Sequence, residues 1–477
     1  MPHAGRAERP DPALPRLAGI LIVGAIAPLL DSTIVNVAIG TLGRDLHTSL
    51  AAVQWVVTGY LLALAMAVPA TGWLVGRFGA KRMWLVSLVM FLAGSMLCGV
   101  AWRGVAWNVG SLIAFRVLQG VGGGLMLPIL QTLIMRAAGG RALGRLFATI
   151  TIPALVGPIL GPVIGGLIVG NADWRWIFYV NVPVCGLALA LAWRGLPDDA
   201  PQGGRRLDVR GLTLLSPALA AIIYGRAQVG TFGGFGHAAV AVPLALGVAL
   251  LGAFVVHALR ARTEAVVDLR LFRVRSFAAA SALLFLSGLS MYGAMLLLPL
   301  YYQQVRGQGV VAAGLLLAPQ GLGSLLTRGP LGTLIDRIGP RPVILAGTAL
   351  TALGTLAYTQ AGPHTSELLL AVSLVVRGAG LSGATVAVMA AAYRDLAPGD
   401  IPHASSATRI VQQVGGSFGA AVLAVVLQRQ LAGHSTATAY DDAFWWSLAC
   451  TALGVLPALL VPRVRRPAGA PEVRTRT

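Results

Sequence analysis

One acidic residue lies deep inside an apolar stretch of this sequence. Asp31 falls about two thirds of the way through residues 17–40, a run long enough to cross a bilayer. An ionisable side chain at such a depth costs about 2.5–3.5 kcal/mol on insertion scales, and its default interpretation is functional. Because burial disfavours the charged form of a carboxylate, we expect Asp31 to bind and release a proton. The residue therefore points to a proton-coupled membrane transporter.

Arg116 is the cation that can pair with Asp31. Each residue lies seven or eight positions from the outer end of its apolar run, or roughly 10–12 Å below the same surface at about 1.5 Å per residue. A nearby cation favours the ionised carboxylate while burial opposes it, so such a pair can change protonation with conformation. The alternative is a purely structural ion pair, because a buried charge needs a partner in any case.

The composition is that of an all-α polytopic membrane protein. Mean hydropathy is +0.77, 56% of the residues are hydrophobic, and only 11% are charged. A window of about 20 residues predicts fourteen transmembrane spans. Their cores are residues 17–38, 51–73, 83–102, 108–135, 146–169, 177–193, 209–225, 238–258, 277–302, 310–334, 343–361, 367–391, 407–428 and 443–462.

The basic residues support this count. Of the 36 Lys and Arg residues, 27 fall at the termini and in the loops after even-numbered spans, and six, Arg226 among them, fall in the alternate loops. By the positive-inside rule both termini are expected in the cytoplasm. The net charge of +19 then reflects topology, which argues against a nucleic-acid-binding protein.

A short turn occurs twice, after the second and after the tenth predicted span. Glycine, leucine, arginine, glycine and a basic residue recur at matching positions of residues 72–82 and 332–341. The match predicts two homologous halves of the parallel kind that builds many secondary transporters. The expected gating residues are Gly72, Arg77, Gly79 and Lys81 in the first copy, and Asp336, Arg337, Gly339 and Arg341 in the second.

The fifth predicted span carries small residues on one face. Gly157, Gly161 and Gly165 recur at every fourth position, a spacing that lets helix backbones approach closely. Pro158 and Pro162 remove two backbone donors and favour a bend. A bent, closely packed helix can serve as a sliding surface in alternating access, and ordinary close packing explains the same pattern.

Together these motifs resemble the major facilitator superfamily, in its fourteen-helix drug:proton antiporter branch. Besides the two turns, the resemblance rests on four segments. They are Leu30–Ala38 in the first helix, Leu112–Gly122 in the fourth, Gly157–Gly166 in the fifth (which ends on Gly165 and Gly166), and Trp174–Pro183 at the entry to the sixth. It implies a six-helix bundle over residues 1–193, a linker with two extra helices over 194–275, a second six-helix bundle over 276–463 and a basic cytoplasmic tail over 464–477. One departure stands out, because Gly76 occupies a position where the family usually has an acid.

The resulting hypothesis is proton-driven efflux of lipophilic small molecules, drugs or antibiotics across a bacterial cytoplasmic membrane. Asp31 would bind the proton and Arg116 would tune it. A specific metabolite or nutrient carrier of the same fold is the alternative, and a polytopic membrane enzyme a more distant one. Candidate cavity residues are the polar or aromatic side chains that interrupt apolar spans: Asn36, Gln54, Tyr60, Gln131, Tyr292, Tyr301, Arg377 and Gln412.

Patterns typical of enzymes carry little weight here. Residues 378–383 satisfy GxGxxG and residues 415–419 satisfy GxSxG, but both fall inside predicted spans without the strands that these motifs require. Three cysteines and seven scattered histidines offer no metal-ligand spacing. We therefore expect no cofactor beyond a proton gradient. The expected partners are a small-molecule substrate, protons and the bilayer, and a periplasmic adaptor is compatible with the sequence.

Overall fold

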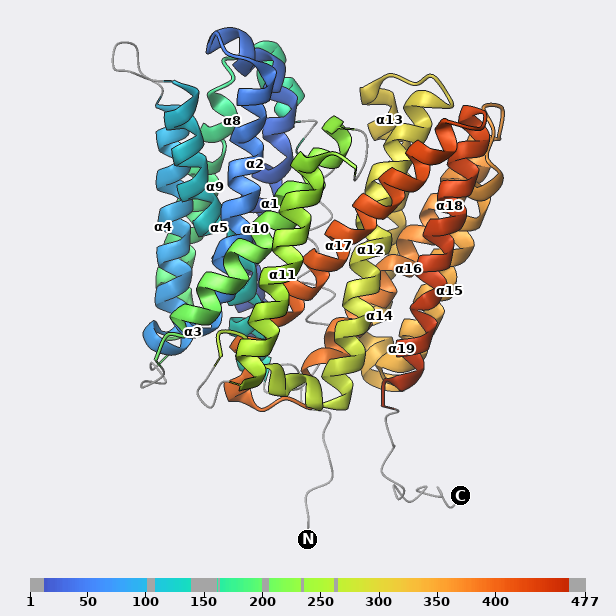
Figure 1. Ribbon diagram of the computed structural model, residues 1–477. Coiled ribbons are helices and arrows are strands. Elements are labelled where there is room, and N and C mark those ends of the chain that lie inside the picture. Colours follow the sequence, from blue (N-terminus) through green and yellow to red (C-terminus); the bar gives the residue numbers. More distant parts are fainter. Residues whose placement is uncertain are drawn as a thin grey trace, which may run out of the picture.

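The protein folds into helices that run between two ends of one bundle (Figure 1). The computed structural model describes residues 13–100, 108–138, 161, 164–199, 206–232, 236–260 and 265–462. Within those ranges every regular element is an α-helix or a 3-10 helix. A helix satisfies its own backbone hydrogen bonds, which lipid cannot do, so apolar sequences of this length fold as helices.

The first half of the chain supplies one group of helices, and a pair of helices follows it. The first group comprises α1 (Ala13–Asp45), α2 (Leu50–Ala67), η1 (Val68–Ala70), α3 (Thr71–Phe78), α4 (Ala80–Gly99), α5 (Val109–Ala138), α8 (Trp176–Tyr179) and α9 (Asn181–Gly195). The pair is α10 (Val209–Phe232) and α11 (Ala238–Arg260).

The second half supplies the remaining helices. They are η2 (Leu269–Arg273), α12 (Arg275–Gln304), α13 (Val310–Leu316), α14 (Ala318–Ile338), α15 (Pro340–Leu356), η3 (Ala357–Gln360), α16 (Glu367–Tyr393), η4 (Pro398–Asp400), α17 (Ile401–Leu431), α18 (Thr436–Leu453) and α19 (Val455–Leu460).

Twelve stretches of the described residues are long and apolar enough to cross a membrane. Of the two further spans that the sequence predicts, the fifth lies mostly outside the described residues. The tenth is interrupted at Leu317, between α13 and α14, and contributes only a shorter apolar helix over Ala312–Thr327. The break lies two residues before Pro319, which lacks a backbone donor and disfavours helix in the residue before it. The count of fourteen stays a prediction.

The two repeated turns share one backbone conformation. Gly79, between α3 and α4, has φ +88° and ψ 151°, and Gly339, between α14 and α15, has φ +85° and ψ 167°. Side chains other than glycine rarely adopt these angles. Both turns lie at the same end of the molecule, the lower end in Figure 1, which we call the turn end.

The halves meet at the turn end through α17. Its N-terminal part packs against α3, η1 and α5 of the first half. Thr132 of α5 donates a hydrogen bond to Ser405 of α17 (3.3 Å), and the Tyr393 hydroxyl at the end of α16 donates to Gln131 of α5 (3.3 Å). Buried His403 of α17 lies beside Gly72 of α3. The structure is therefore closed at the turn end.

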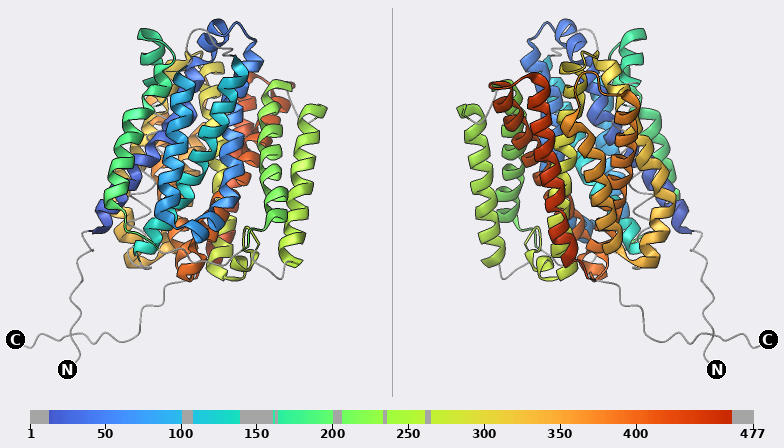
Figure 2. Two further views of the ribbon diagram at one scale, coloured as in Figure 1. Left: turned by 90° about the vertical axis from the view of Figure 1, so that its left-hand side faces the viewer. Right: turned by 90° about the vertical axis from the view of Figure 1, so that its right-hand side faces the viewer.

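The pair α10 and α11 lies at one edge of the bundle, as the two side views show (Figure 2). Helix α10 packs on α2 of the first half and α17 of the second, whereas the most apolar window of α11 is only 17% buried. The assignment of Arg226 to an external loop is wrong, because the residue lies inside α10. The helix continues past it to Phe232, and on either side of Arg226 the Gln228 amide donates to the Tyr224 hydroxyl along the helix (2.8 Å).

Candidate functional site

Asp31 and Arg116 form an ion pair in the interior of the first half. One carboxylate oxygen, Asp31 Oδ2, accepts a hydrogen bond from Arg116 Nη1, and both side chains are fully buried. Asp31 lies on α1 and Arg116 on α5, so the pair joins two helices that are far apart in sequence. The pairing predicted from their matching depths is confirmed.

Two amides complete the environment of the carboxylate. Gln119 Nε2 donates to Asp31 Oδ1 (2.9 Å), and Asn181 Nδ2 of α9 donates to the same oxygen (3.1 Å). Gln119 Oε1 in turn accepts from Arg116 Nη1 (2.8 Å), and Asn181 also donates to Ser95 of α4 (3.0 Å). Helices α1, α4, α5 and α9 are thus connected through one buried polar network centred on a single acid.

Arg116 is held from a third direction by α2. Its Nε donates to the carbonyl oxygen of Val56 (3.1 Å), and its guanidinium carbon lies 4.1 Å from the centroid of the Tyr60 ring. The Phe178 ring lies on another side, at 5.7 Å. A guanidinium over aromatic faces is stabilised by the ring quadrupole. Arg116 can therefore stay bound to α2 even when its contact with Asp31 is lost.

Glycines set how closely the helices around the pair approach. A Cβ on Gly94 of α4 would lie 2.7 Å from the backbone nitrogen of Gln119, and one on Gly120 of α5 would lie 2.9 Å from Ala63 Cβ. Real Cβ atoms almost never come this close, so both helix crossings require glycine. Close crossings leave the network no room for bulk water, which strengthens its electrostatic interactions.

The first turn owes its charge arrangement to an acid from elsewhere in the chain. Asp199, four residues after α9, accepts hydrogen bonds from the backbone nitrogens of Ala80 (2.5 Å) and Lys81 (3.1 Å) at the start of α4. Arg136, near the end of α5, lies 3.1 Å from the same carboxylate. A carboxylate at a helix N-terminus is stabilised by the unpaired N–H groups and the helix dipole.

Lys81 makes a second link between α4 and the segment after α9. Its Nζ lies 2.9 Å from Asp198 Oδ1, and this hydrogen bond lowers the pKa of the exposed Asp198 carboxyl. In this turn, where Gly76 replaces the usual acid, Asp198 and Asp199 supply the negative charge. We infer that the first of the two turns has carboxylates of its own, although Gly76 itself carries none.

The remaining gating residues lie at the surface of the turn end. Arg77 is exposed in the first turn, and Asp336 and Arg337 are exposed in the second, while Arg341 is half-buried at the start of α15. Asp336 has interactions of its own. The two turns therefore share backbone geometry but differ in where their acids come from.

The fifth predicted span is described only in part. Gly157, Pro158 and Pro162 lie outside the described residues. A Cβ on Gly165 would lie 2.9 Å from the carbonyl oxygen of Ile34, and Gly161 faces the neighbouring turn of α1. Gly166 has open space beside it. One face of this segment therefore packs tightly on α1, close to the helical turn that holds Asp31.

The predicted cavity residues do not gather at one place. Tyr60 belongs to the ion-pair network, where its hydroxyl donates to the Pro28 carbonyl (3.0 Å). Gln131 bonds Tyr393 at the turn end. Tyr301, at the opposite end, packs in an aromatic cluster with Tyr302, Tyr358, Tyr440 and Phe444.

The other five lie on separate helices. Gln54 is exposed on α2, Gln412 is buried on α17, and Tyr292 is half-buried on α12 against Gly416. Asn36 lies on α1, and its side chain is not described. Arg377 is buried on α16 and is treated below. Among the described residues, no cluster of three His, Cys, Asp or Glu side chains could hold a metal ion.

Sequence reasoning missed two participants in the network, Gln119 and Asn181, and also Asp199 at the first turn. Gln119 could have been found, because it follows Arg116 by three positions and so shares its helix face. Asn181 interrupts an apolar run at the start of α9, which is a weaker signal. The Asp198-Asp199 pair follows an apolar span directly, but its reach to α4 depends on tertiary structure alone.

Comparison with known proteins identifies the family to which this chain belongs. Residues 21–420 match the family profile described as Major Facilitator Superfamily. The chain is 38% identical over 439 residues to a multidrug resistance protein B homolog of Mycobacterium tuberculosis, covering 91% of this chain and 80% of that protein. It is 32% identical over 437 residues to a tetracenomycin C resistance and export protein of Streptomyces glaucescens, covering 89% and 77%.

Solved structures share the fold at low sequence identity. The human organic anion transporter MFSD10 superimposes with a TM-score of 0.62 at 16% identity, covering 95% of this chain and 100% of that one. The proton:xylose symporter XylE gives a TM-score of 0.62 at 14% identity, covering 95% and 96%.

Proposed function

Because this chain belongs to the major facilitator superfamily, in its drug efflux branch, we propose that it exports lipophilic small molecules in exchange for protons. It is a multi-pass integral membrane protein and a transporter, not an enzyme. Its relatives named for multidrug and tetracenomycin C resistance support a role in resistance to antibiotics.

The observation that carries proton coupling is the buried network around Asp31. Three side chains donate to its carboxylate, and one of them is a cation. A protonated Asp31 would direct its own O–H at one of these donors, so proton binding has to rearrange the network. Since Asp31, Arg116 and Asn181 lie on α1, α5 and α9, that rearrangement changes how three helices of the first half are held together.

Arg116 has an alternative set of partners that makes the rearrangement reversible. When the carboxylate is neutralised, Arg116 keeps the Val56 carbonyl, the Gln119 oxygen and the Tyr60 ring. Removing one member of a buried ion pair is costly when the other is left without compensation. These neutral partners reduce that cost, so a proton can bind to Asp31 and dissociate from it without unfolding the first half.

We infer that the conformational step of transport opens the contacts between the two halves at the turn end. In this structure the halves are connected there by the Thr132–Ser405 and Tyr393–Gln131 hydrogen bonds. Neutral bonds of this kind contribute about 0.5–1.5 kcal/mol each, so they can be exchanged during a cycle. We place the turn end on the cytoplasmic side of a bacterial cell membrane, with both termini, because the basic residues concentrate in its loops.

Transport into everted membrane vesicles tests the proposal. Vesicles containing the protein are energised to acidify their lumen, and uptake of ethidium and of the neutral dansylglycinamide is followed by fluorescence. We expect uptake above that of vesicles lacking the protein, and its loss when nigericin collapses the pH gradient. Uptake that continues unchanged without a gradient of protons would contradict proton coupling.

A further inference from the structure

The second half contains a buried arginine that no carboxylate neutralises within the described residues. Arg377 of α16 is 1% exposed. Its Nη1 donates to Gln320 Oε1 of α14 (2.8 Å) and its Nε donates to Thr355 Oγ1 of α15 (3.2 Å). Its other terminal nitrogen, Nη2, has no hydrogen-bond partner among the described residues.

The repeat makes Arg377 the counterpart of Arg116. Gly339 follows Gly79 by 260 positions, and Arg377 follows Arg116 by 261. The two arginines lie on equivalent helices, α5 and α16, each packed along its neighbour α4 or α15. Arg116 has Asp31 as its counter-ion, whereas Arg377 has only an amide and a hydroxyl at hydrogen-bond distance.

The phenol next to Arg377 does not replace the missing acid. Tyr358 of η3 interacts electrostatically with Arg377, but its hydroxyl bonds the Tyr302 hydroxyl (2.9 Å) and the Leu370 carbonyl (3.3 Å). A tyrosine is uncharged at physiological pH. An unpaired charge in low dielectric is costly, and natural proteins retain such a charge where a ligand pairs with it.

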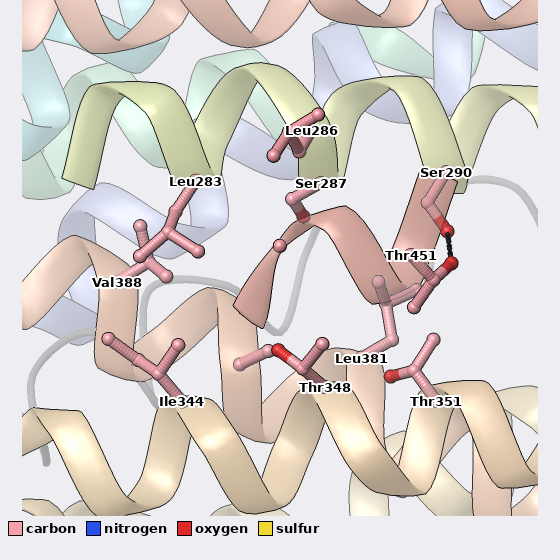
Figure 3. A pocket seen from close by; sticks show the side chains of 12 residues that line it. Leu283, Leu286, Ser287, Ser290, Ile344, Thr348, Thr351, Leu381, Val388 and Thr451 are labelled. Atoms are coloured by element: carbon pink, nitrogen blue, oxygen red, sulfur yellow. Dashed lines mark hydrogen bonds between the residues drawn. The ribbon is translucent and has the colours of Figure 1, made fainter. Parts of the chain in front are cut away.

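A pocket lies along α15 and α16, the helices of Thr355 and Arg377, and Figure 3 shows the residues that line it. Thr351 of α15 lines it and precedes Thr355 by four residues, and Leu381 of α16 lines it and follows Arg377 by four residues. Residues four apart on a helix lie about 5–6 Å from each other. The pocket is small, with a cavity volume of about 40 Å³, and lies between α12, α15, α16 and α18.

The lining of the pocket is apolar with hydroxyls at intervals. Leucine, isoleucine and valine side chains form its walls, and Figure 3 shows the Ser287 and Thr348 hydroxyls turned toward the enclosed space. Ser287 Oγ is buried without a hydrogen-bond partner in the described part of the chain. Ligand sites commonly combine apolar walls with a few convergent polar groups in this way.

We propose that Arg377, Gln320 and Thr355 form a subsite for a monoanionic group, and that the small adjoining pocket takes the part of the apolar body nearest to that group. This inference rests on the proposed function and names its preferred substrates: lipophilic molecules that carry one ionised acid. A carboxylate matches the guanidinium fork, with Nη2 open and Nη1 held by a neutral amide. Because charge-assisted bonds are roughly twice as strong as neutral ones, the carboxylate displaces Gln320 from Nη1.

The position of Gln320 provides access to this subsite. Gln320 is half-buried on α14, three residues after the helix break at Leu317 and directly after Pro319. Helix α13 ends and α14 begins at this break, where the chain can bend. The amide can therefore cover Arg377 when the subsite is empty and move aside for a ligand.

Ligand binding to purified protein in detergent tests the subsite without relying on transport. The probes are dansylglycine, a lipophilic monoanion, and dansylglycinamide, its neutral analogue, whose fluorescence rises in apolar sites. We expect dansylglycine to bind more tightly, and Arg377→Gln to reduce the ratio of the two affinities at least tenfold. Arg226→Gln is the matched control, because it removes another arginine from a membrane helix, and it should leave the ratio within twofold.

Thermal unfolding separates this role from a structural one and covers the case of a poorly folding variant. An unliganded cation without a counter-ion is a cost to the fold, so Arg377→Gln should unfold at the same temperature or higher. A structural role predicts unfolding at a lower temperature, and that result overturns the proposal. Arg377→Lys keeps the charge without the fork and should show an intermediate affinity ratio.

Repeating the titrations in sodium chloride and in sodium gluconate identifies the source of the anion. Dansylglycine affinity that is equal in both salts assigns the subsite to the acid of the organic substrate. Weakening by chloride that disappears in Arg377→Gln assigns it to small inorganic anions as well. An unchanged affinity ratio in Arg377→Gln, or an equal change in Arg226→Gln, overturns the subsite. Failure of gradient-driven uptake would instead refute only the proposed function.

Discussion

Replacing Asp31 with asparagine should uncouple transport and destabilise the first half together. The substitution keeps the shape of the side chain but removes its charge. Asp31 accepts from Gln119 and Asn181 at one oxygen and from Arg116 at the other. An asparagine offers one oxygen and one NH2 group, so a donor faces a donor on one side whichever way the amide is turned.

The size of the destabilisation follows from the burial of the pair. Both side chains are fully buried, and removing one partner of such a pair costs about 3–5 kcal/mol. The neutral partners that Arg116 keeps place the cost at the lower end of this range. Removing both charges in Asp31→Asn/Arg116→Gln should recover most of this loss, since neither charge is then left alone. Transport should stay at background in both variants, because neither can bind the coupling proton.

Two measurements check this prediction on the same preparations. Gradient-driven uptake into everted vesicles reports coupling. Labelling by a thiol-reactive fluorogenic dye during heating reports stability, because Cys98 and Cys185 are buried in this half. Asp45→Asn is the matched control on the same helix, since its carboxylate accepts only from Trp174 Nε1 among the hydrogen bonds described (2.8 Å) at the end of α1.

Two outcomes would refute the reasoning. Gradient-dependent uptake at the unmodified level in Asp31→Asn would show that the proton binds elsewhere. A double variant no more stable than Asp31→Asn would show that the cost does not arise from an uncompensated arginine. Loss of uptake in Asp45→Asn as well would show that α1 tolerates no change, and the assignment to Asp31 would lose its basis.

Three further substitutions test other parts of the structure. Arg116→Lys should retain less than a tenth of the uptake, since an ammonium cannot reach Asp31, Gln119 and the Val56 carbonyl together; near-normal uptake would contradict this. Gly79→Ala should reduce the amount of folded protein, because the positive φ costs about 1–3 kcal/mol for alanine; size-exclusion yield measures it. Tyr393→Phe should speed uptake by a few fold, since it removes a bond between the halves worth about 1 kcal/mol; slower uptake would show that the bond is needed in the cycle.

The contact between Asp31 and Arg116 could be predicted because depth in a membrane is readable from sequence. The number of residues from a span end gives the depth directly, and a buried acid requires a partner at the same depth. The rest of the network could not be predicted in this way. Gln119 and Asn181 are neutral, so their presence in a span is compatible with any neighbouring helix.

The fold was predicted because several motifs follow one another in the family's order, and the family assignment is confirmed. The prediction failed at Arg226, where the hydropathy of the sequence predicts the end of a span but the helix continues. An arginine lowers the hydropathy of a window whether it reaches water or packs against protein. Only the neighbours of α10, which lie far away in sequence, decide between the two.

The cavity residues could not be predicted because a polar side chain in a span has several uses. Tyr60 covers a guanidinium, Gln131 bonds the other half, and Tyr301 belongs to an aromatic cluster. Each use satisfies a polar group inside the protein, as burial requires. Sequence identifies that a partner is needed but does not show whether the partner is a substrate or a neighbouring helix.

Because Asp31 in the first half would take up the proton and Arg377 in the second would bind the substrate anion, the membrane potential should contribute differently to the export of neutral and anionic substrates. If one proton enters for each molecule that leaves, a neutral substrate moves one positive charge inward, while a monoanion bound through Arg377 moves two. Each charge contributes about 2.3 kcal/mol per 100 mV, so a membrane potential of about 100 mV alone supplies about 4.6 kcal/mol for the export of the anion. In proteoliposomes of matched orientation, a potassium diffusion potential imposed with valinomycin should therefore drive dansylglycine to a steeper gradient than dansylglycinamide. Equal gradients for both compounds would show that the proton and substrate charges are not moved together, and that Arg377 and Asp31 act in separate events.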